Sequence, residues 1–371
     1  MNFGLGVVGL TRHRGYAHYN TSTINAGQIT GTLTNFPMLV YGTFSQLATV
    51  ANGGKVQNAN GYDIIFSSNT KSDGSGILPF EIISWNATSG AFAAYVQVPS
   101  AAVGTQIYLL YGNSTVSTDK SNVAGVWSNG YVAVWHFGSR NGSLTSDSCG
   151  NAPLISSSGV SQSSLAGSIG GFAMNFGNNA ANYAASAALA ALATPNVTLE
   201  CWTYLNAVSS SSNGQWFLGA TTTSGNYPGC YVRQGTTTTV DWVGQGTSGN
   251  GGWRSDPGLL AATTWQQIVA VCSSPTTNNG GLGPNAAGAT AYFNGVVPDV
   301  QDPFSNNSVG NIGGGNVLAF LGNLKGLISA DDFALNGYLS ECRISSVART
   351  AAWVQATYNN QSAPGSFSTL S

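Results

Sequence analysis

Short runs of alternating or β-branched apolar residues recur along most of the chain, with Gly, Asn and Ser residues between them. In the first third of the sequence these runs occupy residues 22–24, 36–42, 62–67, 79–85, 91–99 and 106–111. Further along they occupy residues 131–137, 171–176, 197–204, 216–219, 265–271, 289–295 and 318–322. Strand side chains alternate between two faces, so this pattern of short runs and turn residues predicts an all-β sandwich architecture.

The segment around residues 338–344 predicts a strand that carries two charges. Strict alternation places Leu339, Glu341 and Arg343 on one face, and Tyr338, Ser340, Cys342 and Ile344 on the other. Glu341 and Arg343 are two residues apart on the shared face, so we expect their side chains to pair.

A short helix is predicted directly after this strand. Thr350 is a suitable N-cap residue, because its hydroxyl can accept a hydrogen bond from the first helical turn. We expect the helix to run from Ala351 to about Thr357, with Trp353 and Ala356 on one face.

Length and composition restrict the function. The 371 residues suffice for a large core and for two or three domains. Charged residues make up only 6%, against roughly 25% in ordinary soluble domains, so hydroxyls and amides must form most of the surface. The net charge of −2, without a basic cluster, excludes the electrostatic footprint of a nucleic-acid-binding protein.

The sequence gives no indication of a membrane span or an export signal. No apolar run approaches the roughly 18 residues that a membrane helix needs. The apolar run at residues 3–10 precedes its basic residues, which is the reverse of a signal peptide. The five cysteines, at positions 149, 201, 230, 272 and 342, lack zinc-type spacing, so we expect buried thiols, with at least one disulfide as the alternative.

Five segments between residues 31 and 113 resemble, in order, a small β domain of unknown function. That domain commonly precedes laminin-G-like domains in bacterial surface proteins and phage proteins. The segments are Gly31–Pro37, Asp63–Phe66, Leu78–Trp85, Tyr95–Pro99 and Ile107–Asn113.

The rest of the chain resembles the concanavalin A-like lectin/glucanase fold in its laminin-G-like form. The resemblance lies in Tyr131–Phe137, in Asp147–Asn151 and in the closing segment at 333–362. Together the two resemblances imply two β-sandwich domains in series, the second a jelly roll. We expect an N-terminal docking arm at 1–15, a small β-sandwich at 16–113, a linker at 114–127 and the jelly roll at 128–371.

The acidic residues argue against an enzyme. A glycosidase needs a pair of carboxyl groups, and for retention they lie about 5–5.5 Å apart. Glu81, Glu200 and Glu341 each stand alone in their strand, with no acidic residue within four positions. His136 lies in a predicted strand beside Trp135, and a structural role is the favoured interpretation. We therefore predict no catalytic residues.

A calcium site is implied by the resemblance alone. Laminin-G-like domains often bind Ca²⁺ through oxygen ligands, and Asp147 and Asn151 match the family's loop. The family usually carries an aspartate where this chain has Ser340, which removes one charge. The alternative is a simple turn in which Asp147 caps its own backbone.

A sugar site is suggested by the segment at 241–256. It combines aromatic rings, which suit the apolar face of a sugar, with charged groups that suit its hydroxyls. The candidate residues are Asp241, Trp242, Trp253, Arg254 and Asp256, with Tyr227 and Trp216 as secondary candidates. The alternative is that Trp242 belongs to the core and Trp253 covers an edge.

The favoured function is a non-enzymatic structural protein at the surface of a phage virion: a decoration, fibre or tail-associated subunit. The alternative is a secreted or cell-surface carbohydrate-binding adhesin of a bacterium. Expected partners are other virion subunits or copies of the chain itself, and host surface glycans. The arm is expected to dock by burying Phe3, Leu5, Val7, Val8 and Leu10 against a neighbouring subunit, with Arg12 and Arg14 at the rim.

Overall fold

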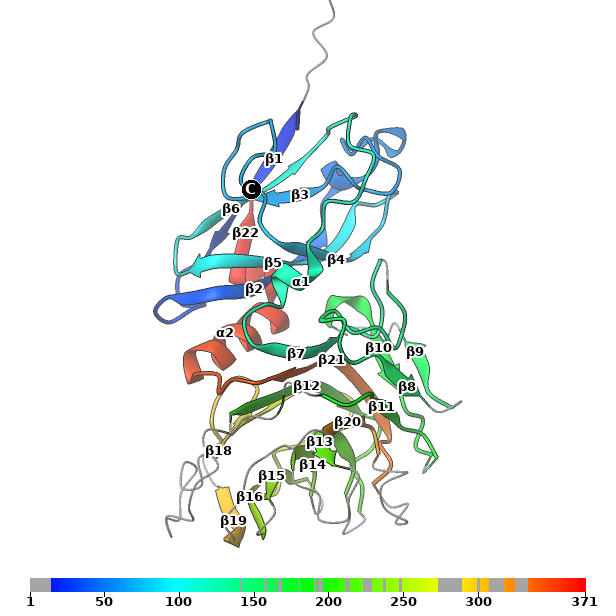
Figure 1. Cartoon of the computed structure of the whole chain (residues 1–371), viewed down its shortest axis with the longest axis vertical. Helices are drawn as coiled ribbons and strands as arrows, with labels where there is room; N and C mark the ends of the chain where they lie inside the picture. Colours follow the sequence, from blue (N-terminus) through cyan, green and yellow to red (C-terminus); the bar gives the residue numbers. More distant parts are fainter. Residues whose placement is uncertain are drawn as a thin grey trace, which may run out of the picture.

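The computed structural model describes residues 15–140, 142–156, 159–163, 165, 169–179, 181–189, 192, 196–210, 214–222, 229–235, 238–246, 249–272, 289–298, 301–306, 317–323 and 333–371. Two β-sandwiches follow one another along the long axis, and the helix α2 (Ala351–Ser362) lies between them (Figure 1). The prediction of an all-β fold with two sandwiches is confirmed. Among the described helices, none combines the length and apolar character needed to cross a membrane.

The first sandwich consists of two small antiparallel sheets, with the strand orders β22-β1-β6-β3 and β2-β5-β4. Its strands are β1 (His18–Ile24), β2 (Leu33–Thr43), β3 (Ile65–Ser67), β4 (Phe80–Trp85), β5 (Ala91–Ala101), β6 (Gln106–Tyr111) and β22 (Ser368–Leu370). The Phe66 ring of one sheet lies 5.8 Å from that of Phe80 and 6.2 Å from that of Phe92, both on the other sheet. These contacts hold the sheets face to face.

The second sandwich has larger sheets. One has the order β18-β17-β12-β21-β10-β9, with β7 also paired to β21, and the other has the order β19-β16-β15-β14-β13-β20-β11-β8. The strands of the first are β7 (Tyr131–Trp135), β9 (Ser161–Ser163), β10 (Ala173–Asn175), β12 (Val197–Leu205), β17 (Trp265–Cys272), β18 (Ala289–Phe293) and β21 (Gly337–Ser345). Those of the second are β8 (Leu154–Ser156), β11 (Ala184–Ser186), β13 (Trp216–Thr222), β14 (Gly229–Gln234), β15 (Val240–Gly246), β16 (Gly249–Ser255), β19 (Gln301–Asn306) and β20 (Val317–Leu321).

Alternation along β12 gives the first of these sheets two buried faces. Leu199 and Cys201 pack into the core between the two large sheets, with Phe217 of β13. Trp202, on the other face, belongs instead to the core of the first sandwich. The two sandwiches are therefore packed against each other through apolar side chains, and not merely joined by a connection.

The end of the chain returns to the first sandwich. β22 pairs antiparallel with β1, and the short helix α3 (Pro364–Phe367) before it places Phe367 in the core, stacked on Phe36 with ring centroids 6.0 Å apart. The expectation that residues 128–371 form one jelly roll is therefore wrong for the last nine residues, 363–371. The reason is that β1 has one side unpaired by β6, and β22 satisfies its backbone groups.

The segment at 114–127 is not a free linker. It contains the helix α1 (Val123–Val126), which is capped by the Asn122 side chain, and its Val126 and Trp127 side chains are buried. The Asn122 N–H also donates to the Phe80 carbonyl at 3.0 Å. The connection is polar in sequence, but its last residues are part of the first sandwich's core.

A β-bulge in β21 changes the predicted alternation. Opposite β12 the register passes from Arg343 to Ser340, so Glu341 and Cys342 together face one residue, and Glu341 has a positive φ of 50°. The bulge puts Leu339 on the same core face as Cys342 and Ile344, which strict alternation had separated. Glu341 and Arg343 stay together on the opposite face, toward the first sandwich, as predicted.

The predicted helix after β21 is confirmed and is longer than expected. The Thr350 hydroxyl accepts from the Trp353 N–H at 3.2 Å, and Trp353 and Ala356 are both buried. The helix α2 continues to Ser362, and its last turn carries residues that contact the first sandwich.

Truncation of Phe367 to alanine is expected to destabilise the first sandwich, although this residue lies at the far end of the chain. Removing a fully buried phenylalanine should lower the free energy of unfolding by about 3–5 kcal/mol. Urea denaturation followed by tryptophan fluorescence measures the loss, with Ser366→Ala, at an exposed neighbouring position, as the control. Equal stability of the two variants would contradict the assignment of the C-terminus to the first core.

Candidate functional site at the junction of the sandwiches

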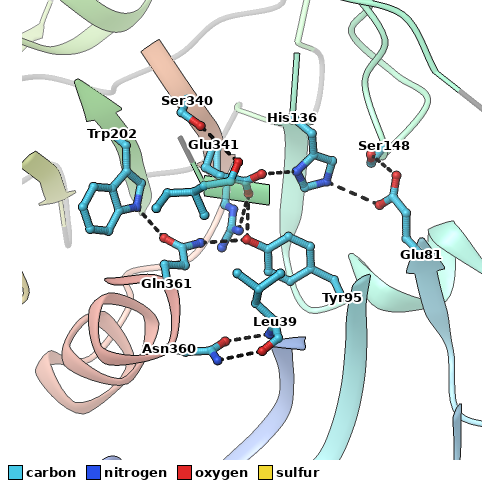
Figure 2. A network of polar contacts seen from close by, with 12 residues as sticks. Leu39, Glu81, Tyr95, His136, Ser148, Trp202, Ser340, Glu341, Asn360 and Gln361 are labelled. Atoms are coloured by element: carbon cyan, nitrogen blue, oxygen red, sulfur yellow. Dashed lines mark hydrogen bonds and ion pairs between the residues drawn. The ribbon is translucent and has the colours of Figure 1, made fainter. Parts of the chain in front are cut away.

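His136 lies between two carboxylates at the junction. Its Nδ1 is 2.6 Å from Oε1 of Glu341, and its Nε2 is 3.4 Å from Oε2 of Glu81 (Figure 2). Glu81 comes from β4 of the first sandwich, whereas Glu341 comes from β21 of the second. The imidazole therefore joins the two sandwiches through its two nitrogen atoms.

Glu341 is the centre of this network. Its Oε2 accepts from Arg343 Nη2 at 2.6 Å and from the Tyr95 hydroxyl at 2.9 Å. The bulge aims the carboxylate out of its own sheet, and this orientation allows both contacts. The Arg343 guanidinium also lies over the rings of Tyr95 and Trp127, 4.9 and 5.0 Å from their centroids.

The other carboxylate, Glu81, has its own donors. The indole N–H of Trp127 donates to Oε2 at 2.7 Å, and the Ser148 hydroxyl donates to Oε1 at 2.8 Å. Trp127 belongs to the connection between the sandwiches and Ser148 to the second sandwich. Glu81 thus ties three parts of the chain together.

The helix α2 extends the network to its other side. Gln361 donates to the Tyr95 hydroxyl at 3.1 Å and accepts from the Trp202 indole N–H at 2.6 Å. Asn360 accepts from the Leu39 N–H at 2.6 Å and donates to the Leu39 carbonyl at 2.9 Å (Figure 2). The side chain of Asn360 therefore acts like a strand residue added to β2.

The charges of the network are mutually stabilised. Burial by itself lowers the pKa of His136, but Glu341 and Glu81 outweigh it and raise that pKa to about 9. Burial would raise the pKa of Glu341, but His136 and Arg343 lower it to about 2. Burial likewise opposes ionisation of Glu81, yet His136 and the donated hydrogen bonds bring its pKa below the usual value. Two cations and two anions thus neutralise one another.

These groups are buried away from solvent. His136 is 3% exposed, Glu81 5% and Glu341 1%. The third glutamate, Glu200, is also buried, and burial raises its pKa despite the nearby charges of Arg343 and Arg349. The expectation of a structural role for His136 agrees with this geometry.

Asp147 organises the loop that follows β7. Its Oδ1 accepts from the N–H groups of Val134 and Cys149, and its Oδ2 accepts from those of Asn151 and Ala152, at 2.8–3.0 Å. The carboxylate is thus occupied by four backbone donors, which favours the capped turn over calcium ligation by Asp147 and Asn151. No group of three or more His, Cys, Asp or Glu able to hold a metal occurs in the described part of the chain.

Ser340 forms hydrogen bonds that an aspartate at this position could not form. Its hydroxyl lies 2.8 Å from the Phe172 carbonyl and 3.3 Å from the Ile169 carbonyl. A hydroxyl can donate to a carbonyl, whereas an ionised carboxylate cannot. The serine therefore suits this position, and the residue connects β21 to the loop before β10.

The expected sugar site at 241–256 is wrong for Trp242. Its ring is 3% exposed and packs in the core between the large sheets, because β15 turns this face inward. Asp241 is fully buried and accepts from Arg254 Nε at 2.7 Å, with Arg233 Nη2 3.1 Å from its other oxygen. Both carboxylate oxygens therefore bind arginines of the protein itself.

The other candidate sugar residues are described only in part. Asp256 is exposed beyond the end of β16, and Trp216 is buried. Trp253 pairs with Trp242 in the strand register, but its side chain lies outside the described residues, as does all of Tyr227. The docking-arm residues Phe3, Leu5, Val7, Val8, Leu10, Arg12 and Arg14 also lie outside them.

Cys149, Cys201 and Cys342 are free thiols. Cys201, Cys272 and Cys342 are buried and Cys149 is partly buried. Burial raises the pKa of the Cys201 thiol, so it stays protonated and behaves as a small apolar side chain. The expectation of buried thiols is confirmed for Cys201 and Cys342.

Residues 176–355 match the Concanavalin A-like lectin/glucanases superfamily. The chain carries a concanavalin A-like domain. Residues 60–142 match a domain of unknown function, so the two-domain order implied by the sequence is confirmed. The match at 60–142 continues beyond β6 and includes Trp127 and His136, which contact Glu81.

The solved structures that match the chain resemble it only distantly. The receptor-binding domain of botulinum neurotoxin type G is 14% identical, with a TM-score of 0.42, over 63% of this chain and 52% of that one. Domain 4 of an extracellular arabinanase from Geobacillus stearothermophilus, in complex with arabinotriose, is 15% identical, with a TM-score of 0.40, over 61% and 96%. A Trypanosoma rangeli sialidase is 10% identical, with a TM-score of 0.44, over 78% and 44%.

The chain spans about half the length of the first of these structures. No curated protein matches its sequence.

Replacement of Tyr95 by phenylalanine tests the network at its centre. The change removes one hydroxyl that donates to Glu341 and accepts from Gln361, and it leaves both buried partners short of a hydrogen bond. We expect a loss of about 1–3 kcal/mol in the free energy of unfolding, measured by urea denaturation. Tyr108→Phe is the matched control, since the Tyr108 hydroxyl donates to Gln106 near the surface and to no other described residue. Equal effects of the two changes would contradict a central role for Tyr95.

The pKa shifts predict a pH dependence of stability with two limits. The folded protein holds the proton of His136 more tightly than the unfolded chain does, so charged His136 stabilises the fold. This contribution is complete below pH 6.5 and is lost as the pH rises through about 9. A lowered pKa acts in the opposite direction, so the contribution of Glu341 is complete above pH 4.5 and lost as the pH falls through about 2. Urea midpoints should therefore be highest near pH 4.5–6.5.

His136→Gln should abolish the decline between pH 6.5 and 9, whereas His18→Gln, which alters a histidine outside the network, should preserve it. A wild-type stability that stays constant over this interval would rule out the charged state of His136.

Proposed function

We propose that the protein is a non-enzymatic structural subunit of a virion that holds a lectin-like sandwich on a rigid base for contact with glycans. The main support for this proposal is the junction between the sandwiches. There, the carboxyl groups that could act in a glycosidase instead bind the other sandwich. Glu81 and Glu341 bind His136 from opposite sides, and their oxygens are filled by protein donors. An unpaired partner in such a buried network costs several kcal/mol, so the geometry is strongly held.

The surface properties support a role in a larger assembly. Charged residues make up 6% of the chain and the net charge is −2, so little repulsion keeps copies apart. The thiols of Cys149, Cys201 and Cys342 are free, which fits synthesis in a reducing compartment followed by release without an oxidising step. The alternative function is a secreted adhesin with the same domains, which would not need to assemble with other copies.

We expect the full-length protein to form oligomers through its arm. Light scattering after size-exclusion chromatography should give a mass above one chain for the full-length protein and the mass of a monomer after deletion of residues 2–14. Circular dichroism should give the same melting temperature for both, because the first described strand, β1, begins only at His18. Arg12→Ala with Arg14→Ala is the companion variant, which should weaken assembly without removing it.

A full-length protein that remains monomeric at high concentration would contradict the subunit role and favour the adhesin. Release of reducing sugar from a glycan panel, abolished by Glu81→Gln or Glu341→Gln, would contradict the non-enzymatic role.

A further inference from the structure

A hollow of about 310 Å³ opens where the first sandwich meets the turn after β7. It is lined by Ala59, Asn60, Tyr62, Trp85, Ala87 and Arg140. Five of these residues belong to the first sandwich, whereas Arg140 belongs to the second. The volume lies near the lower end of the range of roughly 300–1,000 Å³ found for small-molecule sites, which suits a small ligand or one unit of a larger one.

Trp85 forms a fixed apolar wall of the hollow. Its indole N–H donates to the Leu47 carbonyl at 2.8 Å, so its polar atom is already satisfied. Gly61, with a φ of +70°, lies directly against the ring, and a Cβ at that position would be 2.8 Å from Cε3. The ring is thereby held in place while part of it remains exposed, as is part of Tyr62.

Arg140 supplies the polar side of the hollow. Its Nη2 is 2.5 Å from Oδ2 of Asp119, its Nη1 donates to the Asn60 carbonyl at 3.3 Å, and its guanidinium carbon lies 5.6 Å from the centre of the Tyr62 ring. Among the described residues, the buried Nε–H of Arg140 has no hydrogen-bond partner. The Arg140 side chain as a whole is 14% exposed and lines the hollow, so part of it faces a ligand there.

The charges select the class of ligand. Asp119 neutralises Arg140, so the hollow offers donors and acceptors without a net charge that would favour an anion. Two partly exposed rings suit the apolar C–H face of a sugar, and the guanidinium with the neighbouring Asn60 suits its hydroxyls. We infer that this hollow binds a neutral saccharide, an inference that rests on the glycan contact proposed above and places it at the junction.

The test uses the full-length protein on an array of neutral and acidic glycans, with affinities for the hits from calorimetry. Two variants change the hollow by different means: Trp85→Ala removes a wall, and Ala87→Phe fills the space without removing a core contact. We expect each to weaken binding of a neutral glycan by about tenfold or more. Tyr41→Ala, at a tyrosine of the same sandwich that is 47% exposed and outside the hollow, should leave the affinity unchanged.

The outcomes separate the site from the proposed function. If the wild-type protein binds a neutral glycan and both variants bind it equally well, the site is wrong, while glycan contact by the protein stands. Binding to acidic glycans alone, or to none, overturns the inference of a neutral saccharide. Oligomerisation is measured separately by light scattering, so the absence of glycan binding on the array would not contradict the role as a subunit. The melting temperature of each variant is compared with that of the wild-type protein, so that a loss of affinity is not mistaken for a loss of folding.

Discussion

The paired charges around Glu341 are the constraint on which the arrangement of the sandwiches depends. A buried carboxylate is tolerated only when its neighbours compensate for the lost water, and here the compensation comes from both sandwiches. Tyr95 belongs to the first sandwich, whereas Arg343 and His136 belong to the second. Separating the sandwiches would leave Glu81 on one side and Glu341 on the other without part of their partners. The same contacts therefore set both the spacing and the rotation of the two units.

The path of the chain adds a second constraint. α2 leaves the second sandwich, contacts Leu39 through Asn360, and leads to β22, which completes a sheet of the first. Residues more than 340 positions apart are paired in that strand, as the contact of Asn25 with Thr369 illustrates. Such pairing closes a very long loop, so the first sandwich reaches its final form only after the whole chain is available. The two units are thus expected to gain stability together and not as independent domains.

Much of the fold was predictable from local patterns, but the junction was only partly so. Alternation gave the strands and the pairing of Glu341 with Arg343, and Thr350 marked the start of α2. Alternation failed at Leu339, because a bulge inserts a residue and shifts the face of everything before it. It also could not say which side of β15 is the core, so a sugar-facing and a core position of Trp242 both stayed open, and the structure shows the core position. The partners of His136 were missed since Glu81 and Glu341 are 260 positions apart; three lone glutamates in a charge-poor chain were the available signal.

The locked junction also explains why a shallow hollow at its edge can act as a binding site. One wall of that hollow, Trp85, extends from β4, the strand that carries Glu81, and Arg140 follows β7, just after His136. The ion pairs of Glu81 and His136 therefore fix the distance between the aromatic wall and the guanidinium. A ligand that bridges the two would not have to order them, which reduces the entropic cost of binding. Stability and recognition then share one physical origin. The buried charges hold the sandwiches together, and they also position Trp85 and Arg140, which lie a few residues further along the chain.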